Sequence, residues 1–429
     1  MDQERPGLVA WLLRPMRVGG LALIAAAYGV TFTVVPRLGV QQDNVYAETV
    51  LVANRAGLAK DALIIDPHMI NPWGIALRPP GAGGHFWISN AGNLSTSTFI
   101  GDVPGMPLHQ DGLKIVYLKG PLLSYEDGLA NVTGQVYNAA SDVPKQPVEF
   151  PVSGPASNLS GATAVALGVK SGAAKFVFVT TDGTINAWRA STAESMDAAV
   201  IVKDYSDHGH DQIRDLPRLP AFTGVAMSAK PGGGNRLYVT DFQNNIIRVL
   251  DNTWADITAS VPFERPAGMP PEWSAYNVQL LDGRLYVTYA AVDLNAEEAA
   301  FDMPAPGAGK VVAYDLDGHL VQQFGDAGRL NSPWGLAMAP ANFGAFSGAL
   351  LVANFGDGTI AAFDVRTGHF LDYMRDAAGT PIAIDGIWGL AFGNGVSLGE
   401  ADSLYFTAGP NQEQDGLFGR LRYAALARK

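Results

Sequence analysis

The stretch Ser332–Ala337 reads SPWGLA, and the stretch Leu350–Asp364 behind it reads LLVANFGDGTIAAFD. The first is a short apolar strand that begins beside a Trp-Gly pair. The second is a hairpin of two apolar strands joined at Asp357-Gly358, a dipeptide that tolerates the positive φ of a tight turn. Together the two phrases predict one small antiparallel unit.

Both phrases recur along the chain in the same order. Copies of the short-strand phrase are NPWGIA at 71–76, TGQV at 133–136, FTGVA at 222–226 and IWGLA at 387–391. Copies of the hairpin are FVFVTTDGTINAW at 176–188 and LYVTDFQNNIIRVLD at 237–251. Tyr276-Asn277-Val278 lies where a further copy of the short strand belongs. A repeated strand module of this kind is typical of a solenoid or a propeller.

The spacing of the copies gives six units, which begin near residues 71, 133, 222, 276, 332 and 386. Repeats of about 40–60 residues made of short strands indicate blades of four-stranded sheet around an axis. We therefore predict an all-β fold, a six-bladed β-propeller formed by residues 48–429. The longest spacing, between the units at 133 and 222, predicts an insertion in the second blade.

The sixth unit has only three strand-like segments before the chain ends. Glu48–Ala53 is a spare strand ahead of the first unit. We expect this strand to complete the last blade, because joining the two chain ends removes an open sheet edge.

Residues 1–47 have the order of a secretory leader. Arg14 and Arg17 precede an apolar run over 18–35, and a polar segment follows, with a cleavage site after Ala47. The run is also long enough to anchor the chain in a bilayer, and a buried helix is a third alternative. Either main interpretation places the propeller outside the cytoplasm, secreted or periplasmic, with membrane contact only through this N-terminal signal or anchor helix.

Composition excludes several classes of function. The chain has 429 residues, a formal net charge of −12 and no cysteine. The acidic balance and the lack of a Lys/Arg cluster argue against nucleic-acid binding. Without cysteine there is no disulfide, thiolate zinc site or cysteine nucleophile.

NPWGIA, SPWGLAMAP, LLVANFGDGTIAAFD and IDGIWGLAFGNG, with LYFTAG and GLFGRL behind them, resemble a bacterial family of exported NHL-like six-bladed propellers whose activity is uncharacterised. The resemblance covers roughly residues 48–421. It implies the fold and export, and it implies no catalytic residue. The Pro-rich stretch between Asp102 and Pro155 departs from the pattern and leaves the second blade poorly defined.

In a propeller the entry loops of the innermost strands and the hairpin turns open on one face. Their polar and aromatic residues are therefore expected to gather at the mouth of the central channel as a ligand-binding rim. This predicted rim consists of Asn71, Trp73, Asn90, Asp241, Asn277, Trp334, Asn354, Asp385 and Trp388.

Four of the rim residues, Asp241, Asn277, Asn354 and Asp385, offer the oxygen ligands that calcium prefers, so calcium is the one candidate cofactor. The competing interpretation is structural, since Asn and Asp at turns commonly bond their own backbone. For the three tryptophans the alternatives are a stacking surface for a flat ligand and indoles wedged between neighbouring blades. The acidic loop Asp293–Asp302 is interpreted as solvated surface.

Two functions remain open. The first is a binding or scaffold module for a small molecule, a glycan or a protein. The alternative is a calcium-dependent hydrolase or lactonase with its site at the channel mouth, where the ion would polarise a carbonyl. No catalytic residue is assigned, because propellers host unrelated functions.

Overall fold

The computed structural model describes residues 43–119, 130–142, 148–155, 169–190, 196, 198–206, 220–230, 233–293, 302–325 and 327–425. Among these residues there is no helix with the length and hydropathy needed to cross a membrane. The predicted leader segment, residues 18–35, lies outside them. Residues 42–429 form one compact unit.

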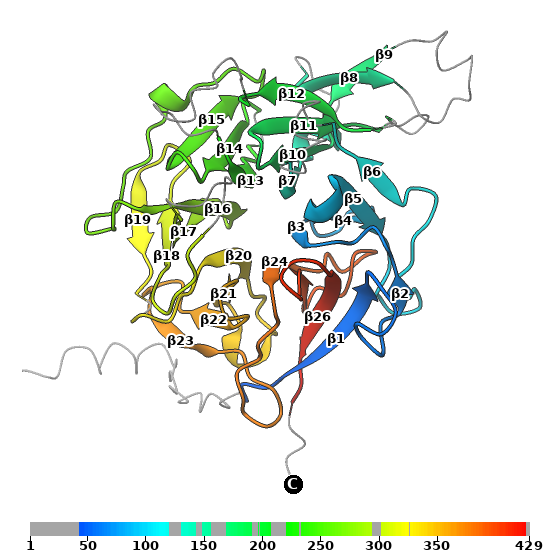
Figure 1. Ribbon diagram of the computed structural model, residues 1–429, viewed down its shortest axis with the longest axis vertical. Helices are drawn as coiled ribbons and strands as arrows, with labels where there is room; N and C mark the ends of the chain where they lie inside the picture. Colours follow the sequence, from blue (N-terminus) through cyan, green and yellow to red (C-terminus); the bar gives the residue numbers. More distant parts are fainter. Residues whose placement is uncertain are drawn as a thin grey trace, which may run out of the picture. The chain divides into compact units, whose positions relative to one another are not determined.

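Within this unit the strands form six antiparallel sheets arranged as blades around an axis (Figure 1). Blade 1 is β3 (Pro72–Ala76), β4 (Phe86–Asn90), β5 (Ser95–Phe99) and β6 (Ile115–Tyr117). Blade 2 is β7 (Val132–Tyr137), β10 (Phe176–Thr180), β11 (Thr184–Trp188) and β12 (Val200–Asp204). Blade 3 is β13 (Phe222–Met227), β14 (Arg236–Asp241) and β15 (Ile246–Asp251).

The second half of the chain forms the other three blades. Blade 4 is β16 (Trp273–Leu281), β17 (Arg284–Ala291), β18 (Lys310–Tyr314) and β19 (Leu320–Gln323). Blade 5 is β20 (Pro333–Met338), β21 (Leu350–Asn354), β22 (Ile360–Phe363) and β23 (Phe370–Tyr373). Blade 6 is β24 (Ile387–Phe392), β25 (Ser403–Ala408), β26 (Leu417–Tyr423) and β1 (Tyr46–Ala53), with β2 (Ile64–Ile65) added outside β1. The predicted all-β class, the six blades and their starting points are confirmed.

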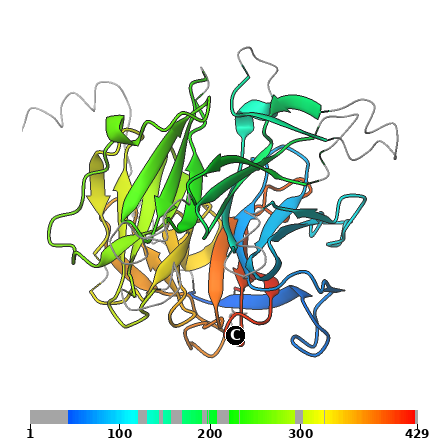
Figure 2. The ribbon, with the colours of Figure 1, turned by 45° about the horizontal axis from the view of Figure 1, so that its top comes forward.

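The predicted insertion in blade 2 is a separate hairpin, β8 (Pro151–Pro155) and β9 (Val169–Ala173), between the first and second strands of that blade. Short 3₁₀ turns complete the described elements, at η1 (Ala91–Asn93), η2 (Ala139–Asp142), η3 (Thr258–Ser260) and η4 (Gly344–Phe346). Figure 2 shows the inserted hairpin projecting above blade 2.

Blade 3 differs from the four-stranded expectation, because its described part has three strands. The chain behind β15 touches the sheet only locally, where the Ile257 N–H donates to the Val249 carbonyl oxygen. Pro262, Pro266, Pro270 and Pro271 follow. Proline has no N–H to donate, so this segment cannot form a regular fourth ladder.

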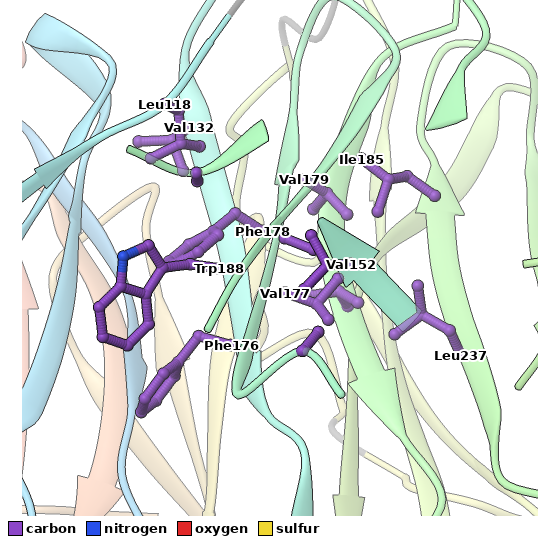
Figure 3. Packing of buried hydrophobic residues seen from close by; sticks show 14 of the residues in the cluster. Leu118, Val132, Val152, Phe176, Val177, Phe178, Val179, Ile185, Trp188 and Leu237 are labelled. Atoms are coloured by element: carbon purple, nitrogen blue, oxygen red, sulfur yellow. The ribbon is translucent and has the colours of Figure 1, made fainter. Parts of the chain in front are cut away.

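The blades pack through side chains that alternate along each strand. In β10, Phe176 and Phe178 face one side with Trp188, while Val177 and Val179 face the other with Ile185 and Leu237 (Figure 3). Trp87 of blade 1 stacks on Phe176 with a centroid distance of 4.1 Å. This strand is buried on both faces, which explains its continuous apolar sequence.

The first and last strands of the chain meet in blade 6. β1 pairs antiparallel with β26 from Tyr46↔Tyr423 to Ala53↔Leu417. Leu51, Val52 and Ala53 have no exposed surface. The predicted ring closure is therefore confirmed.

The closing strand starts earlier than the expected boundary at residue 48. Tyr46 is buried, its hydroxyl donates to the Phe343 carbonyl oxygen at 2.9 Å, and its N–H donates to the Arg375 carbonyl oxygen. Asn44 Nδ2 donates to the Tyr373 carbonyl oxygen at 2.8 Å. The position after Ala47 thus lies inside β1.

The recurring glycine of the short-strand phrase lies where neighbouring innermost strands come closest. A Cβ on Gly74 would lie 2.7 Å from the Thr133 carbonyl oxygen in blade 2, and a Cβ on Gly389 would lie 2.5 Å from the Trp73 carbonyl oxygen in blade 1. A Cβ on Gly335 would collide with the Trp388 carbonyl oxygen. Blade 4 has Asn277 at this position, and its Nδ2 donates to the Trp334 carbonyl oxygen at 2.9 Å.

We expect Gly335→Ala to lower the free energy of unfolding by about 2–3 kcal/mol, because the new methyl group forces two backbone strands apart. Urea unfolding followed by circular dichroism measures this. Gly112→Ala is the matched control, since Gly112 is exposed and a Cβ there meets nothing within 4 Å. Equal stability of the two variants would contradict the close-approach explanation.

Candidate functional site

The three recurring tryptophans meet at the start of the innermost strands. Trp73 and Trp388 stack with ring centroids 3.6 Å apart, and Phe355 stacks on Trp388 at 4.0 Å. Trp334 lies edge-on to both indoles, with centroid distances of 5.8 Å. We call Trp73, Trp334, Trp388 and Phe355 the aromatic floor.

The floor spans the channel. Trp334 belongs to blade 5, yet its Nε1 donates to the Thr223 carbonyl oxygen of blade 3 at 3.0 Å. The three indoles are at most 5% exposed. They therefore pack against one another across the channel. The predicted alternative in which each indole is wedged singly between neighbouring blades does not describe them.

Below the floor the channel is hollow. A cavity of about 310 Å³ begins beside Trp334 and runs along the innermost strands. Leu77, Gln135, Val225 and Leu390 are among its lining residues. Gln135 is engaged within the wall, since its Nε2 donates to the Gly74 and Trp87 carbonyl oxygens at 2.8 and 2.6 Å.

Polar side chains gather on the other side of the floor, where the entry loops and hairpin turns lie. Tyr276 donates its hydroxyl to Asp302 Oδ1 at 3.0 Å. Asn71 Nδ2 donates to Glu413 Oε2 at 2.8 Å, and Asn71 Oδ1 accepts from Trp388 Nε1 at 3.0 Å. We call Asn71, Tyr276, Asp302, Ser332 and Glu413 the mouth, and Asp302 with Glu413 the carboxyl pair.

The carboxyl pair lies in an environment that opposes its charge. Burial, together with the charge of Asp302, raises the pKa of Glu413 to about 7, against the hydrogen bond from Asn71. Burial also raises the pKa of Asp302, although hydrogen bonds from Ser332 and Tyr276 partly oppose this. Burial, with both carboxylates nearby, holds the pKa of Tyr276 well above its usual value of 10.0, so the phenol stays neutral.

Three other buried carboxylates have arginine partners, whereas Asp66 and Glu149 accept from neutral donors. Asp102 pairs with Arg420, Asp241 Oδ2 lies 2.7 Å from Arg248 Nη2, and Asp415 Oδ2 lies 2.7 Å from Arg55 Nη2. Within the described part of the chain, Asp302 and Glu413 have no such ion pair. Among the described residues, no cation therefore balances the charge that the carboxyl pair carries when ionised.

Backbone conformations at the mouth are unusual. Asn411, Gln412 and Glu413 are three successive left-handed residues with φ of 59°, 55° and 63°. Asn71 and Ser332, each directly before a proline, have φ of 45° and 44°. A non-glycine residue in this region costs of order 1–3 kcal/mol, and such residues cluster at functional sites.

Several buried polar atoms beside the mouth lack a hydrogen-bond partner among the described residues. They include Trp73 Nε1 and Asn331 Oδ1. Ser332, which has no exposed surface, directs its hydroxyl at the Asp302 carboxyl group. An unmade buried hydrogen bond costs about 1–3 kcal/mol per group, so Trp73 Nε1 and Asn331 Oδ1 are expected to meet a partner outside the described residues.

The other predicted rim residues are engaged locally. Asp241 Oδ1 accepts from the Ala221 N–H at 3.2 Å, and Asn354 Oδ1 accepts from the Asn331 N–H at 3.1 Å, so each ties a hairpin turn to an entry loop. Asn90 Nδ2 donates to Ser95 and Ser97 Oγ, both at 3.0 Å. Asp385 is exposed and accepts from the Asn411 N–H at 3.1 Å.

The four candidate calcium ligands thus bond to different partners. Asn277 lies inside β16 at the glycine position and not in the entry loop where it was expected. Among the residues that the structure describes, no group of three or more His, Asp or Glu side chains is arranged to hold a metal ion. Calcium binding stays a prediction.

Four mouth residues, Tyr276, Asp302, Ser332 and Glu413, were not predicted as site residues. Tyr276-Asn277 occupies the Trp-Gly position of blade 4, a correspondence that the repeat alignment contains. Asp302 was placed on a solvated loop, which is wrong for its carboxyl group, since Oδ2 is buried and Oδ1 accepts from Tyr276. Glu413 belongs to a turn with no counterpart in the other blades, so no repeat signal marks it.

No family model matches the chain. A protein of Acanthamoeba polyphaga mimivirus, "Uncharacterized protein R648", is 29% identical over 374 residues, which are 86% of this chain and 78% of that protein. A second mimivirus protein, "Uncharacterized protein L690", is 35% identical over 190 residues, 44% of this chain and 49% of its own length. These relatives are viral, whereas the sequence phrases resembled a bacterial family.

Solved structures with a similar fold include enzymes. They include an α-L-arabinanase of Penicillium chrysogenum in complex with arabinobiose, with a TM-score of 0.47 and 11% identity over 87% of this chain and 98% of that one. A glucose dehydrogenase has a TM-score of 0.43 and 12% identity over 88% and 100%. Neither likeness carries an argument about function. The chain is a six-bladed β-propeller with relatives in a giant virus of amoebae.

Proposed function

We propose that the protein is a binding module that takes a small ligand at the mouth, above the aromatic floor. One observation supports this most: the Asp302 and Glu413 carboxyl groups have no ion-pair partner among the described residues, and Trp73 Nε1 in the aromatic floor is a buried donor without a partner there. A ligand that bonds to these groups recovers free energy that the free protein forgoes. The strained turn at Glu413 is consistent with a preorganised site, which lowers the cost of binding.

The proposal includes a location outside the cytoplasm, which the leader-like residues 1–47 support. If the leader is removed, a cut before Asn44 preserves the contacts of Asn44 and Tyr46, whereas a cut after Ala47 removes them. Sequencing the N-terminus of protein purified from the native compartment tests both points. An N-terminus at Met1 in a cytoplasmic fraction would contradict export.

A panel of probes tests binding at the mouth. The panel consists of neutral mono- and disaccharides, alkylamines, short carboxylic acids and calcium chloride, each followed by thermal shift and isothermal titration calorimetry. We expect one class to raise the melting temperature of the wild type and of Glu272→Gln, and to leave Asp302→Asn and Glu413→Gln unchanged. Glu272 is an exposed glutamate directly before β16, so it controls for loss of charge.

Failure of every class, or binding that both mouth variants retain, would overturn the proposal. Retained binding would instead place the ligand elsewhere, for instance in the cavity below the floor.

A hydrolase remains the second candidate, favoured by the pKa of about 7 at Glu413. A carboxyl group near neutrality beside a second carboxyl group suits general acid–base catalysis. Turnover of chromogenic esters, lactones or glycosides, with and without calcium, tests this candidate. We expect Glu413→Gln to abolish any such turnover. Activity that persists in the variant would exclude this carboxyl group as the acid or base.

A further inference from the structure

The cavity below the aromatic floor is large enough for a small molecule and has an entrance. Its volume, about 310 Å³, is about twice that of an apolar cavity that binds benzene, and lies at the lower end of the range for ligand pockets. Trp334 lies at the floor end. At the other end the lining includes Pro79, Ala139 and Ala229, which are exposed and follow the last residues of β3, β7 and β13. The cavity therefore opens on the face opposite to the mouth.

The lining of this cavity favours an uncharged ligand. Among the described residues that line it, none has a charged side chain, and many are aliphatic, for example Leu77, Val136, Val225 and Leu390. An ionised group costs much more free energy to bury in such surroundings than an apolar group does. The ligand is therefore expected to be neutral and largely apolar.

The backbone at the floor end adds few unmet hydrogen-bond acceptors. Each innermost strand lies at the end of its sheet, so its carbonyl oxygens on the channel side ordinarily need water or a side chain as a partner. Near the floor, six carbonyl oxygens accept from side chains of other blades. They belong to Trp73, Gly74, Phe222, Thr223, Tyr276 and Trp334, and their donors are Thr407, Gln135, Thr133, Trp334, Thr240 and Asn277. This end of the cavity is therefore suited to the apolar part of a ligand.

One polar side chain of the lining is available to a ligand. The hydroxyl of Tyr137 and the amides of Gln135 and Asn277 are bonded within the protein. The Gln279 amide makes no hydrogen bond to another described residue, and this side chain is only partly buried. Gln279 follows Asn277 by two residues in β16, which places it about 7 Å farther from the floor along the strand. An amide both donates and accepts, and so does a hydroxyl group.

We propose that the cavity is a second ligand site, which binds an uncharged molecule with a compact apolar body and one hydroxyl group. The apolar body lies against Trp334 and Leu390, and the hydroxyl group bonds with the Gln279 amide. The volume suits a body of about two fused six-membered rings, since about half of it holds one. This site is independent of the mouth, because the aromatic floor lies between the two. No bond forms or breaks in the ligand.

Isothermal titration calorimetry of the full-length protein at pH 7 tests the proposal with 2-naphthol, 2-naphthoate and 2-naphthylmethylammonium, which share one ring system and differ in charge. We expect 2-naphthol to bind about tenfold or more tightly than either ion, because only the ions lose a charge's hydration. Gln279→Leu should weaken 2-naphthol about fivefold or more, since the amide that bonds the hydroxyl group is lost. Val136→Phe fills part of the cavity from a partly buried position and should weaken it about tenfold or more.

Gln323→Leu is the matched control for the loss of an amide. Gln323 is an exposed residue of β19 outside the cavity, so this variant should bind 2-naphthol as the wild type does. The melting temperature of each variant shows whether it is folded. If Val136→Phe does not fold, Ala139→Trp takes its place, because that position is exposed at the entrance and a large ring there narrows the opening.

The contrary results are distinct. Equal affinity for 2-naphthol and the two ions would overturn the uncharged class of ligand. No binding of 2-naphthol, or binding that Gln279→Leu and the filling variant both retain, would overturn the site. Loss of 2-naphthol binding in Asp302→Asn but not in Gln279→Leu would place the molecule at the mouth and overturn it too. Because the mouth and the cavity respond to different variants, either proposal can fail while the other stands.

Discussion

Deletion of residues 44–54 is expected to abolish cooperative unfolding. The segment includes β1, which buries Tyr46, Leu51, Val52 and Ala53 and pairs with β26 along its length. Burial of one large apolar side chain stabilises by about 1.5–3 kcal/mol, so the segment contributes on the order of 5–10 kcal/mol. That is comparable with the whole stability of a typical domain, about 5–15 kcal/mol.

Circular dichroism melting measures the effect, and two further samples keep the result interpretable. Leu51→Ala should cost about 2–5 kcal/mol and leave the fold intact, whereas Thr49→Ala, at an exposed position of the same strand, should change little. A synthetic peptide of residues 43–56 added to the truncated protein should restore a melting transition. A truncated protein that melts like the wild type would show that the ring holds without its closing strand.

Glu413→Gln is expected to stabilise the protein at pH 8 and to have no effect on stability at pH 4.5. The folded-state pKa of Glu413 is about 7, above its ordinary value of 4.5. Between these values the folded protein binds a proton that the unfolded chain does not, so stability falls as pH rises through this window. By pH 8 the penalty is nearly complete, about 3 kcal/mol from a shift of this size. Glutamine imitates the protonated form and avoids the penalty.

Urea unfolding of the wild type and the variant between pH 4.5 and pH 8 measures the difference at each pH. Glu272→Gln should give no such pH-dependent difference, because that side chain is exposed. A variant that is less stable than the wild type at pH 8 would mean that the charged carboxyl group is compensated by a partner.

The fold was predictable because the same strand and turn sequences recur in successive blades. The Trp-Gly pairs at 73, 334 and 388 mark the start of an innermost strand in three blades, and the same close approach of backbones demands the glycine each time. At Asp182-Gly183 and Asp357-Gly358 the glycine has φ of 79° and 77°, as the turn chemistry requires. The closure by β1 followed from counting strands.

The site was predictable only in part, because its key residues do not repeat. The three tryptophans do come together, as the propeller geometry predicts. Asp302 and Glu413 lie in hairpin connections that differ from blade to blade, and their burial depends on segments far apart in the sequence. Conversely, Asp241 and Asn354 recur at equivalent positions because each accepts a hydrogen bond from the backbone of an entry loop. Recurrence in the sequence therefore indicated structural residues more strongly than residues of the candidate site.

The pairing of β1 with β26 also sets the order of events during synthesis. The ribosome releases Tyr46 long before Tyr423, so the first strand waits unpaired while the strands between them emerge. Contacts between such distant parts of a chain form slowly, and an unpaired strand edge is prone to aggregation in the meantime. A nascent chain stalled before residue 417 should therefore remain sensitive to protease, and it should become resistant only after β26 has left the ribosome.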